Sequence, residues 1–176
     1  MDTESKYLAS AKQQFLYYKA LGDQAMAQLE PQMLFMQPNE ESNSIAMIIQ
    51  HLHGNMVSRW TNFLTTDGEK EWRQRDAEFE VVLRDKAAVM QKWEEGWDTL
   101  MSTLQELDNN QLSTLVLIRN EAHTVTEAIN RQLAHYPYHV GQIVLYAKQL
   151  LGNKFCSLSI AKNKSQDFNR EKFGSR

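Results

Sequence analysis

Hydrophobic residues recur every three or four positions along four long stretches of the chain, which is the spacing of one face of an α-helix. Polar and turn-forming residues separate these stretches, and Pro31 and Pro38 mark the first separation. The pattern therefore predicts four helices, at about residues 4–29, 43–63, 77–107 and 124–151.

Short signals mark several features of these helices. Ser42 or Asn43 is expected to cap the second helix, because a side-chain oxygen there can accept an N–H of the first turn. Thr124 and Glu127 fit a capping box at the start of the fourth helix. Pro137 lies inside that helix, where it removes one backbone hydrogen bond and is expected to produce a kink.

The connections differ in length and character. The polar stretch 64–76 is long for a turn between antiparallel helices, and at about 3.3 Å per residue it could span roughly 40 Å. Such a crossover would allow the second and third helices to run parallel. Residues 115–118 are apolar and partly β-branched, so an extended segment or small hairpin is expected before the fourth helix. Residues 153–176 form a polar tail without a period, which we expect to be irregular.

Composition supports this helical interpretation and limits the class of protein. Only 7 of the 176 residues are Gly and 3 are Pro, too few for a fold of many strands and turns. The length and the 42% hydrophobic content fit a single all-α domain over residues 1–176. The net charge of −3 gives no sign of the basic face that nucleic-acid binding requires.

Cellular location is predicted from what the sequence lacks. The polar first residues contain no apolar signal core, and no run of about 18 apolar residues suggests a membrane span. The single cysteine, Cys156, cannot form an internal disulfide. We therefore expect a cytoplasmic protein with no membrane or nucleic-acid partner.

Three histidines carry the candidate chemistry. His135 and His139 are four residues apart, so their rings share one face of the fourth helix and can reach one metal ion. His51 lies on the otherwise apolar second helix and could supply a third ligand. The competing interpretation is a hydrogen-bonded core histidine beside a surface pair. Three neutral imidazoles would leave coordination positions open for water or substrate, which is typical of catalytic rather than structural metal sites.

Other residues on the same helix faces are candidates for contacting the ligands or a small-molecule substrate. They are Asn55 on the second helix and Arg131, Gln142 and Tyr146 on the fourth. His53 and His123 are expected to be surface or turn residues rather than ligands. His53 is two residues from His51, and residues two apart do not share a helix face. The sequence has no Gly-rich phosphate loop and no Gly-x-Ser-x-Gly motif.

Several of these motifs together resemble a known family. They are Asn43-Ser44-Ile45-Ala46 leading to His51-Leu52-x-Gly54-Asn55-Met56, the stretch 58–70, His135-x-x-x-His139-x-Gly141-Gln142-Ile143 and Ser157-Leu158-Ser159-Ile160. The chain resembles the DinB-like superfamily, also called the YfiT-like metal-dependent hydrolases, and within it a small bacterial branch of unknown function. The resemblance covers nearly the whole chain.

The resemblance implies a four-helix bundle in up-down-down-up order and a frequent homodimer. It also implies a divalent ion, such as nickel, zinc, iron or manganese, held by His51, His135 and His139. Characterised relatives include S-transferases that use a low-molecular-weight thiol, so thiol transfer or hydrolysis is expected. Pro137 departs from the family pattern and puts the spacing of the two ligands on its helix in question. The alternative is a non-catalytic, stress-linked dimeric protein that binds metal weakly or uses the histidines only to structure the bundle.

Overall fold

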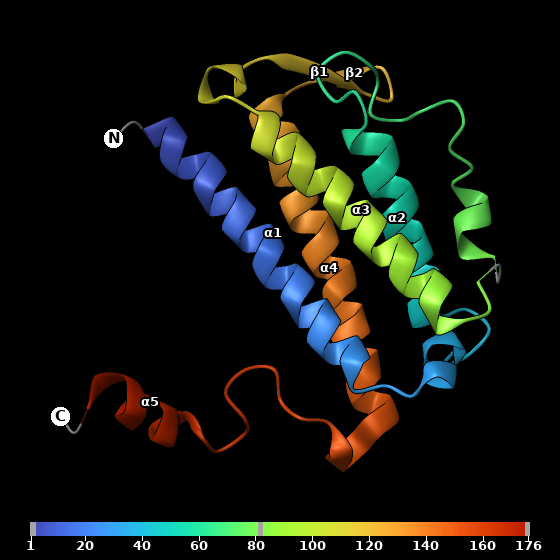
Figure 1. Cartoon of the computed structure of the whole chain (residues 1–176), viewed down its shortest axis with the longest axis vertical. Coiled ribbons are helices and arrows are strands. Elements are labelled where there is room, and N and C mark those ends of the chain that lie inside the picture. Colours follow the sequence, from blue (N-terminus) through green and yellow to red (C-terminus); the bar gives the residue numbers. More distant parts are fainter. Residues whose placement is uncertain (1–2, 81–82, 175–176) are drawn as a thin grey trace.

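Four long helices form the body of the protein in the computed structural model, which describes residues 3–80 and 83–174. They are α1 (Thr3–Ala27), α2 (Ile45–Trp60), α3 (Lys86–Glu106) and α4 (Val125–Leu151). Figure 1 shows α2 and α3 running in the same direction, opposite to α1 and α4. The predicted all-α bundle with up-down-down-up order is therefore confirmed.

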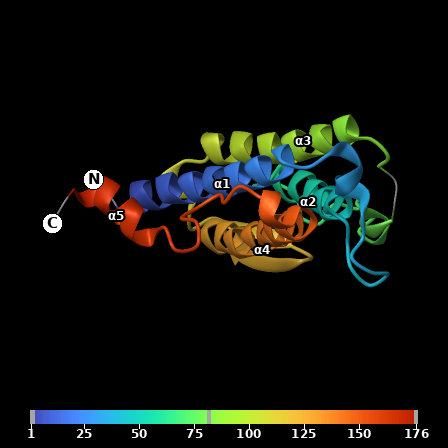
Figure 2. The same ribbon diagram turned by 90° about the horizontal axis from the view of Figure 1, so that it is seen from below.

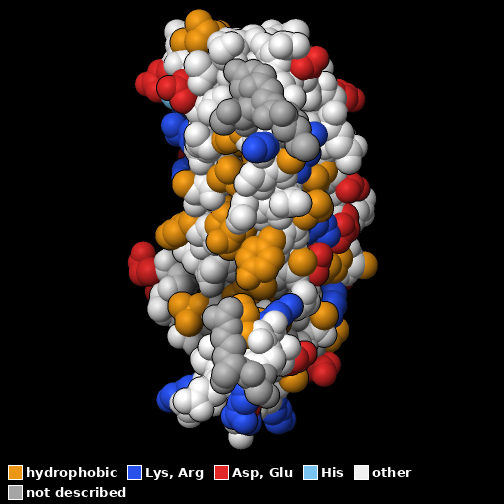
Figure 3. Space-filling view, turned by 90° about the vertical axis from the view of Figure 1, so that its left-hand side faces the viewer, with side chains coloured by type: hydrophobic (Ala, Val, Ile, Leu, Met, Phe, Trp, Pro, Cys, Tyr) orange, Lys and Arg blue, Asp and Glu red, His pale blue; other side chains and the backbone are white. Residues whose placement is uncertain are grey.

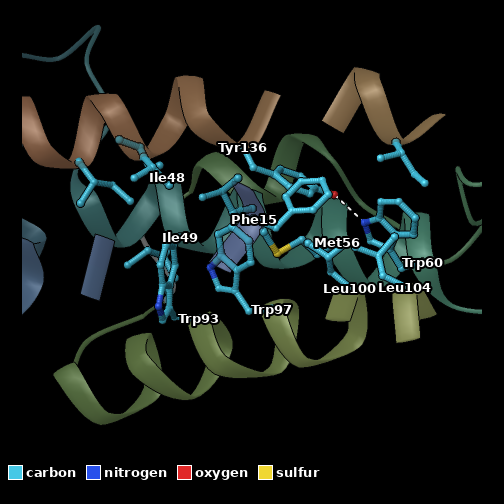
Figure 4. Close-up of a cluster of buried hydrophobic side chains, with 14 of the residues drawn as sticks. Phe15, Ile48, Ile49, Met56, Trp60, Trp93, Trp97, Leu100, Leu104 and Tyr136 are labelled. Carbon is cyan, nitrogen blue, oxygen red and sulfur yellow. Dashed lines mark hydrogen bonds between the residues drawn. The ribbon is translucent and has the colours of Figure 1, made fainter. Parts of the chain in front are cut away.

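Aromatic side chains fill the centre of the bundle, where α2 lies mainly against α3 and α1 against α4. Phe15, Trp97 and Tyr136 are almost completely buried and contact one another (Figure 4). Trp60 donates a hydrogen bond from Nε1 to the Tyr136 hydroxyl at 2.9 Å, so these two polar atoms are paired inside the core. The apolar faces predicted from the sequence thus meet in one core.

Two predicted helix starts are displaced in the structure. Ser44, rather than Ser42 or Asn43, caps α2 by accepting from the Met47 N–H at 3.2 Å. The third helix begins at Lys86, after the cap Asp85, and not near residue 77. The reason is that Asp76–Phe79 form a separate 3-10 turn, η2, held against α2. Residues 81 and 82, which fall within the predicted third helix, lie outside the described residues.

The crossover between α2 and α3 packs along α2. Gln50 on α2 donates from Nε2 to the carbonyls of Ala77 and Glu78 at 2.9 and 3.0 Å, which fixes η2 against the helix. Nearer the other end of α2, the Ser58 hydroxyl donates to the Gly68 carbonyl at 3.1 Å. The part of the connection up to residue 80 is therefore fixed against α2 and can deliver side chains to a site on that helix.

A small antiparallel hairpin precedes α4, as the sequence predicted. Its strands are β1 (Leu115–Ile118) and β2 (Glu121–Thr124), with Ile118 opposite Glu121. The two turn residues, Arg119 and Asn120, have left-handed φ values of 54° and 62°, typical of a two-residue hairpin turn. The Asp67 carboxylate accepts both of their N–H groups at 2.8 and 2.7 Å, which ties the crossover to the hairpin.

The C-terminal tail contains more structure than predicted. A short helix, α5 (Ser165–Phe173), forms in the segment that we expected to be irregular. Figures 1 and 2 show α5 to one side of the bundle, apart from the four long helices. Within the described ranges, no helix is both long and apolar enough to cross a membrane.

Candidate metal centre

The three predicted histidines meet between α2 and α4. Nε2 of His135 lies 3.4 Å from Nε2 of His51 and 3.1 Å from Nε2 of His139. His51 is buried, and the other two rings are partly buried. One ligand atom from each histidine lies within 4.8 Å of the others, so the group could hold a metal ion.

Helix α4 places two of these rings one turn apart. Its start is fixed by the predicted capping box: Thr124 accepts from the Glu127 N–H at 3.1 Å, and Glu127 accepts from the Thr124 N–H at 2.7 Å. The helix continues through Pro137 to Leu151. Pro137 therefore does not prevent the rings of His135 and His139 from meeting.

Each histidine has an oxygen atom at its other ring nitrogen. Nδ1 of His51 lies 2.9 Å from Oε2 of Glu78. Nδ1 of His135 lies 3.3 Å from Oε1 of Gln132, and Nδ1 of His139 lies 2.7 Å from Oε1 of Gln142. These oxygens accept hydrogen bonds, so each ring carries its proton on Nδ1 and leaves the Nε2 lone pair free.

Three free lone pairs therefore point toward one another. Burial, together with the neighbouring His139 and His51 rings, lowers the pKa of His135 to about 3. Burial also lowers the pKa of His139. Neutral imidazoles with oriented tautomers are the form that binds metal, and a cation at the centre would satisfy all three acceptors.

Glu78 supports this arrangement from the crossover. Its side chain is 8% exposed and receives two hydrogen bonds from Arg73, Nε to Oε1 at 2.7 Å and Nη2 to Oε2 at 2.9 Å. Burial opposes its ionisation, but the hydrogen bonds from His51 and Arg73 outweigh that effect and lower the pKa of Glu78. A methyl group at Gly54 would overlap this carboxylate, so glycine there allows Glu78 to reach His51.

A pocket of about 380 Å³ opens beside the histidines and is lined by all three of them. Of the four residues predicted to contact ligands or substrate, Asn55 and Arg131 line this pocket, and Gln142 holds His139. Tyr146 instead lines a second pocket, to which Gln142 also contributes. The pocket is in the size range of small-molecule sites.

The sequence did not identify the residues that orient His51 and His135. Gln132 precedes His135 by three residues, as Gln142 follows His139 by three, and this symmetric spacing on one helix was a usable signal. Glu78 is 27 residues from His51 and was placed at the start of the predicted third helix, so no pattern joined the two residues. Arg73 lies in the polar stretch 64–76, but its side chain is only 2% exposed. His53 and His123 lie outside the cluster, as predicted.

The lowered pKa of His135 predicts how metal-free protein responds to acid. Between pH about 6.5 and about 3 the unfolded chain takes up a proton that the folded His135 does not, so stability falls as pH falls through this range. The slope is at most about 1.4 kcal/mol per pH unit, and less to the extent that solvent screens the ring. Urea unfolding of EDTA-treated protein at pH 7, 6 and 5 measures it.

The His135→Gln variant provides the comparison for this measurement. The free energy of unfolding of this variant should depend less steeply on pH than that of the original chain, because the variant lacks the titrating His135 ring and keeps the other titratable groups. Equal slopes for the two proteins would contradict the assignment.

A comparison with protein families places the chain. Residues 2–164 match the model of a family described as "Protein of unknown function (DUF1572)". Searches of curated proteins and of solved structures found no significant match.

Proposed function

Since the chain belongs to the DUF1572 family of proteins of unknown function, its activity must be inferred from its own residues, and we propose that it is a divalent-metal-dependent enzyme. His51, His135 and His139 are the proposed ligands. The observation that carries the proposal is the convergence of their Nε2 atoms while each Nδ1 faces an oxygen atom. A carboxylate or amide oxygen behind each ligand is the usual support of a metal-binding histidine.

The donor set limits the ion. Three imidazole nitrogens suit zinc, nickel or iron better than calcium or magnesium, which prefer oxygen ligands. Manganese is included only because the family resemblance implies it. Three protein ligands also leave coordination positions open. A divalent ion held there would act as a Lewis acid and lower the pKa of a bound water or thiol.

The protein residues supply binding and orientation. Glu78, Gln132 and Gln142 fix the tautomers of the three histidines, and Asn55 and Arg131 line the space that a substrate would enter. Membership of the DinB-like superfamily is part of the proposal, supported by the up-down-down-up bundle and by ligands on its second and fourth helices. The proposed reaction is transfer of a low-molecular-weight thiol to an electrophile, or hydrolysis.

A homodimer is also proposed. Figure 3 shows hydrophobic side chains gathered along the middle of one face of the molecule. The exposed large hydrophobic residues of α1 are Leu16 and Tyr17, at 51% and 55% exposure. Contiguous exposed apolar surface is typical of protein interfaces. A dimer would suit either the enzyme or a non-catalytic metal-binding protein, and a cytoplasmic location stays a prediction.

Metal binding by untagged protein tests the proposal. Elemental analysis should find about one divalent ion per chain, and EDTA-treated protein should be stabilised by Zn²⁺, Ni²⁺ or Mn²⁺. An ion at 100 times its Kd contributes about 2.7 kcal/mol, which raises the Tm of a domain of this size by roughly 5–10 °C. Unchanged melting with all three ions would contradict the metal site.

Activity is measured separately with a screen of thiol consumption against electrophiles. Metal-loaded protein should consume thiol, and EDTA-treated protein should not. Metal binding without any activity in this screen or in hydrolysis assays would favour the non-catalytic alternative.

A further inference from the structure

The pocket beside the histidines is strongly basic, although the chain has a net charge of −3. Five arginines line it, from α2, the crossover, the hairpin turn and α4. They are Arg59, Arg73, Arg75, Arg119 and Arg131. Among the described residues that line the pocket there is no Asp or Glu. Positive charge is therefore concentrated at the proposed site of substrate entry.

Three of these arginines have acidic neighbours. Arg73 pairs with Glu78 at 2.7 Å and with Glu69 at 3.0 Å, and Arg119 lies 3.4 Å from the same Glu69 carboxylate. Arg75 lies 3.9 Å from Asp76 on the exposed side of the crossover. The ion pairs of the described chain do not include Arg59 or Arg131, so these two carry the excess charge of the pocket.

Arg59 is the unusual member, because it is buried and unpaired. It is 4% exposed, and its Nε and Nη1 atoms are enclosed without any hydrogen-bond partner in the described structure. Gly68 lies against the guanidinium, where a larger residue would overlap Nη1. A buried charge without a partner destabilises a folded protein. The presence of the unpaired Arg59 guanidinium in the pocket wall is explained if a bound ligand supplies the missing negative charge.

The two nearby carboxylates, Asp67 and Glu69, do not form an ion pair with Arg59. Asp67 accepts N–H groups of Glu69, Arg119 and Asn120, at 2.7, 2.8 and 2.7 Å. Glu69 already contacts Arg73 and Arg119. Both acids are close enough to interact electrostatically with Arg59, but their hydrogen bonds and ion pairs are with other groups, and neither forms an ion pair with its guanidinium.

Asn55 adds an oriented donor to the same pocket. Trp60 donates to the Tyr136 hydroxyl, so Tyr136 directs its own proton to Oδ1 of Asn55 at 3.0 Å. With its oxygen thus occupied, Asn55 presents its NH₂ group as the atom that can donate to a ligand. The two successive hydrogen bonds, from Trp60 to Tyr136 and from Tyr136 to Asn55, fix the orientation of the Asn55 amide. Figure 4 shows the first of them inside the core.

We propose that Arg59, with Arg131 and Asn55, binds an oxyanion of the substrate, a carboxylate or phosphate group, while the rest of the substrate reaches the three histidines. A guanidinium forms paired hydrogen bonds with either group, and the pocket size restricts the ligand to a small molecule. Binding of the anion by Arg59 does not need the metal. The claim that the rest of the substrate reaches the histidines rests on the proposed function.

The test uses EDTA-treated full-length protein with inorganic phosphate and, separately, succinate, at constant ionic strength. Calorimetry and thermal melting should show binding of at least one of them. The anion with the lower Kd identifies the favoured source of the oxyanion. The Arg59→Met variant should bind that anion roughly 10- to 100-fold more weakly, because a hydrogen-bonded charge is lost. Without ligand, the same variant should melt at a higher temperature than the original chain, because an unpaired buried charge is gone.

Two further variants keep the outcome clear. Arg59→Lys retains the charge without the planar fork and should bind with intermediate affinity. Arg84→Met removes an exposed arginine outside the pocket and should bind the anion like the original chain. The proposal is overturned if neither anion binds, or if Arg59→Met binds as tightly as the original protein. Anion binding that needs added metal and ignores Arg59 would support the metal site and overturn the arginine site.

Discussion

Replacing His51 and His139 together with alanine is expected to abolish metal binding, with the metal content falling from about one ion per chain to below a tenth. Each residue contributes one of the three converging Nε2 atoms. Loss of a residue that merely supports a metal ligand typically weakens affinity 10- to 100-fold. Removal of two ligands must cost more than that, so the stabilisation by added Zn²⁺ or Ni²⁺ should disappear. Elemental analysis and melting with and without metal measure both effects.

His53→Ala is the matched control. His53 lies on the same helix, two residues from His51, but its Nε2 faces Glu95 at 3.1 Å and it does not join the cluster. This variant should retain the ion and its stabilising effect. Full metal retention by the His51→Ala/His139→Ala protein would rule out the site, and metal loss in His53→Ala would place it elsewhere.

A Glu78→Gln substitution is expected to reduce both stability and metal affinity. It removes the negative charge that pairs with Arg73, whose side chain is only 2% exposed, and breaking a buried ion pair costs about 3–5 kcal/mol. It also removes the carboxylate behind His51, which should weaken metal binding roughly 10- to 100-fold. Urea unfolding of metal-free protein measures the first effect, and metal titration measures the second.

The two roles of Glu78 can be separated with a second change. A Glu78→Gln/Arg73→Met protein also lacks the arginine that loses its partner in Glu78→Gln, so much of the stability should return while metal affinity stays low. Glu80→Gln, on the exposed neighbour two residues away, should change neither quantity. If Glu78→Gln binds metal as tightly as the original chain, the carboxylate does not support the site.

The fold could be predicted because its information is local. Residues such as Trp93, Trp97 and Leu100 repeat at helical spacing, and the structure buries them on one side of α3. The start of α3 was misplaced because Phe79 belongs to a 3-10 turn that tertiary contacts with Gln50 hold in place. Tertiary contacts of this kind do not produce a periodic pattern of hydrophobic residues in the sequence.

The same distinction applies to the site. The four-residue spacing of His135 and His139 is enough to predict that they share a helix face. His51 can be recognised because it is a polar residue in an otherwise apolar helix. Glu78 and Arg59 are different, since their importance depends on the path of the crossover over α2. Arg59 follows the helical pattern of α2 as an ordinary polar residue, and only its burial without a partner distinguishes it.

The position of the histidines across the bundle has a mechanical consequence. α2 packs mainly on α3, and α4 mainly on α1, so the helices form two pairs that meet along a seam. His51 and His135 lie on opposite sides of that seam and are 84 residues apart in the chain. An ion bound by both would act as a reversible cross-link that closes a long loop, much as a disulfide does. Separation of the α2–α3 pair from the α1–α4 pair would then require release of the ion. The protein should therefore unfold more slowly when the metal is bound than when it is absent.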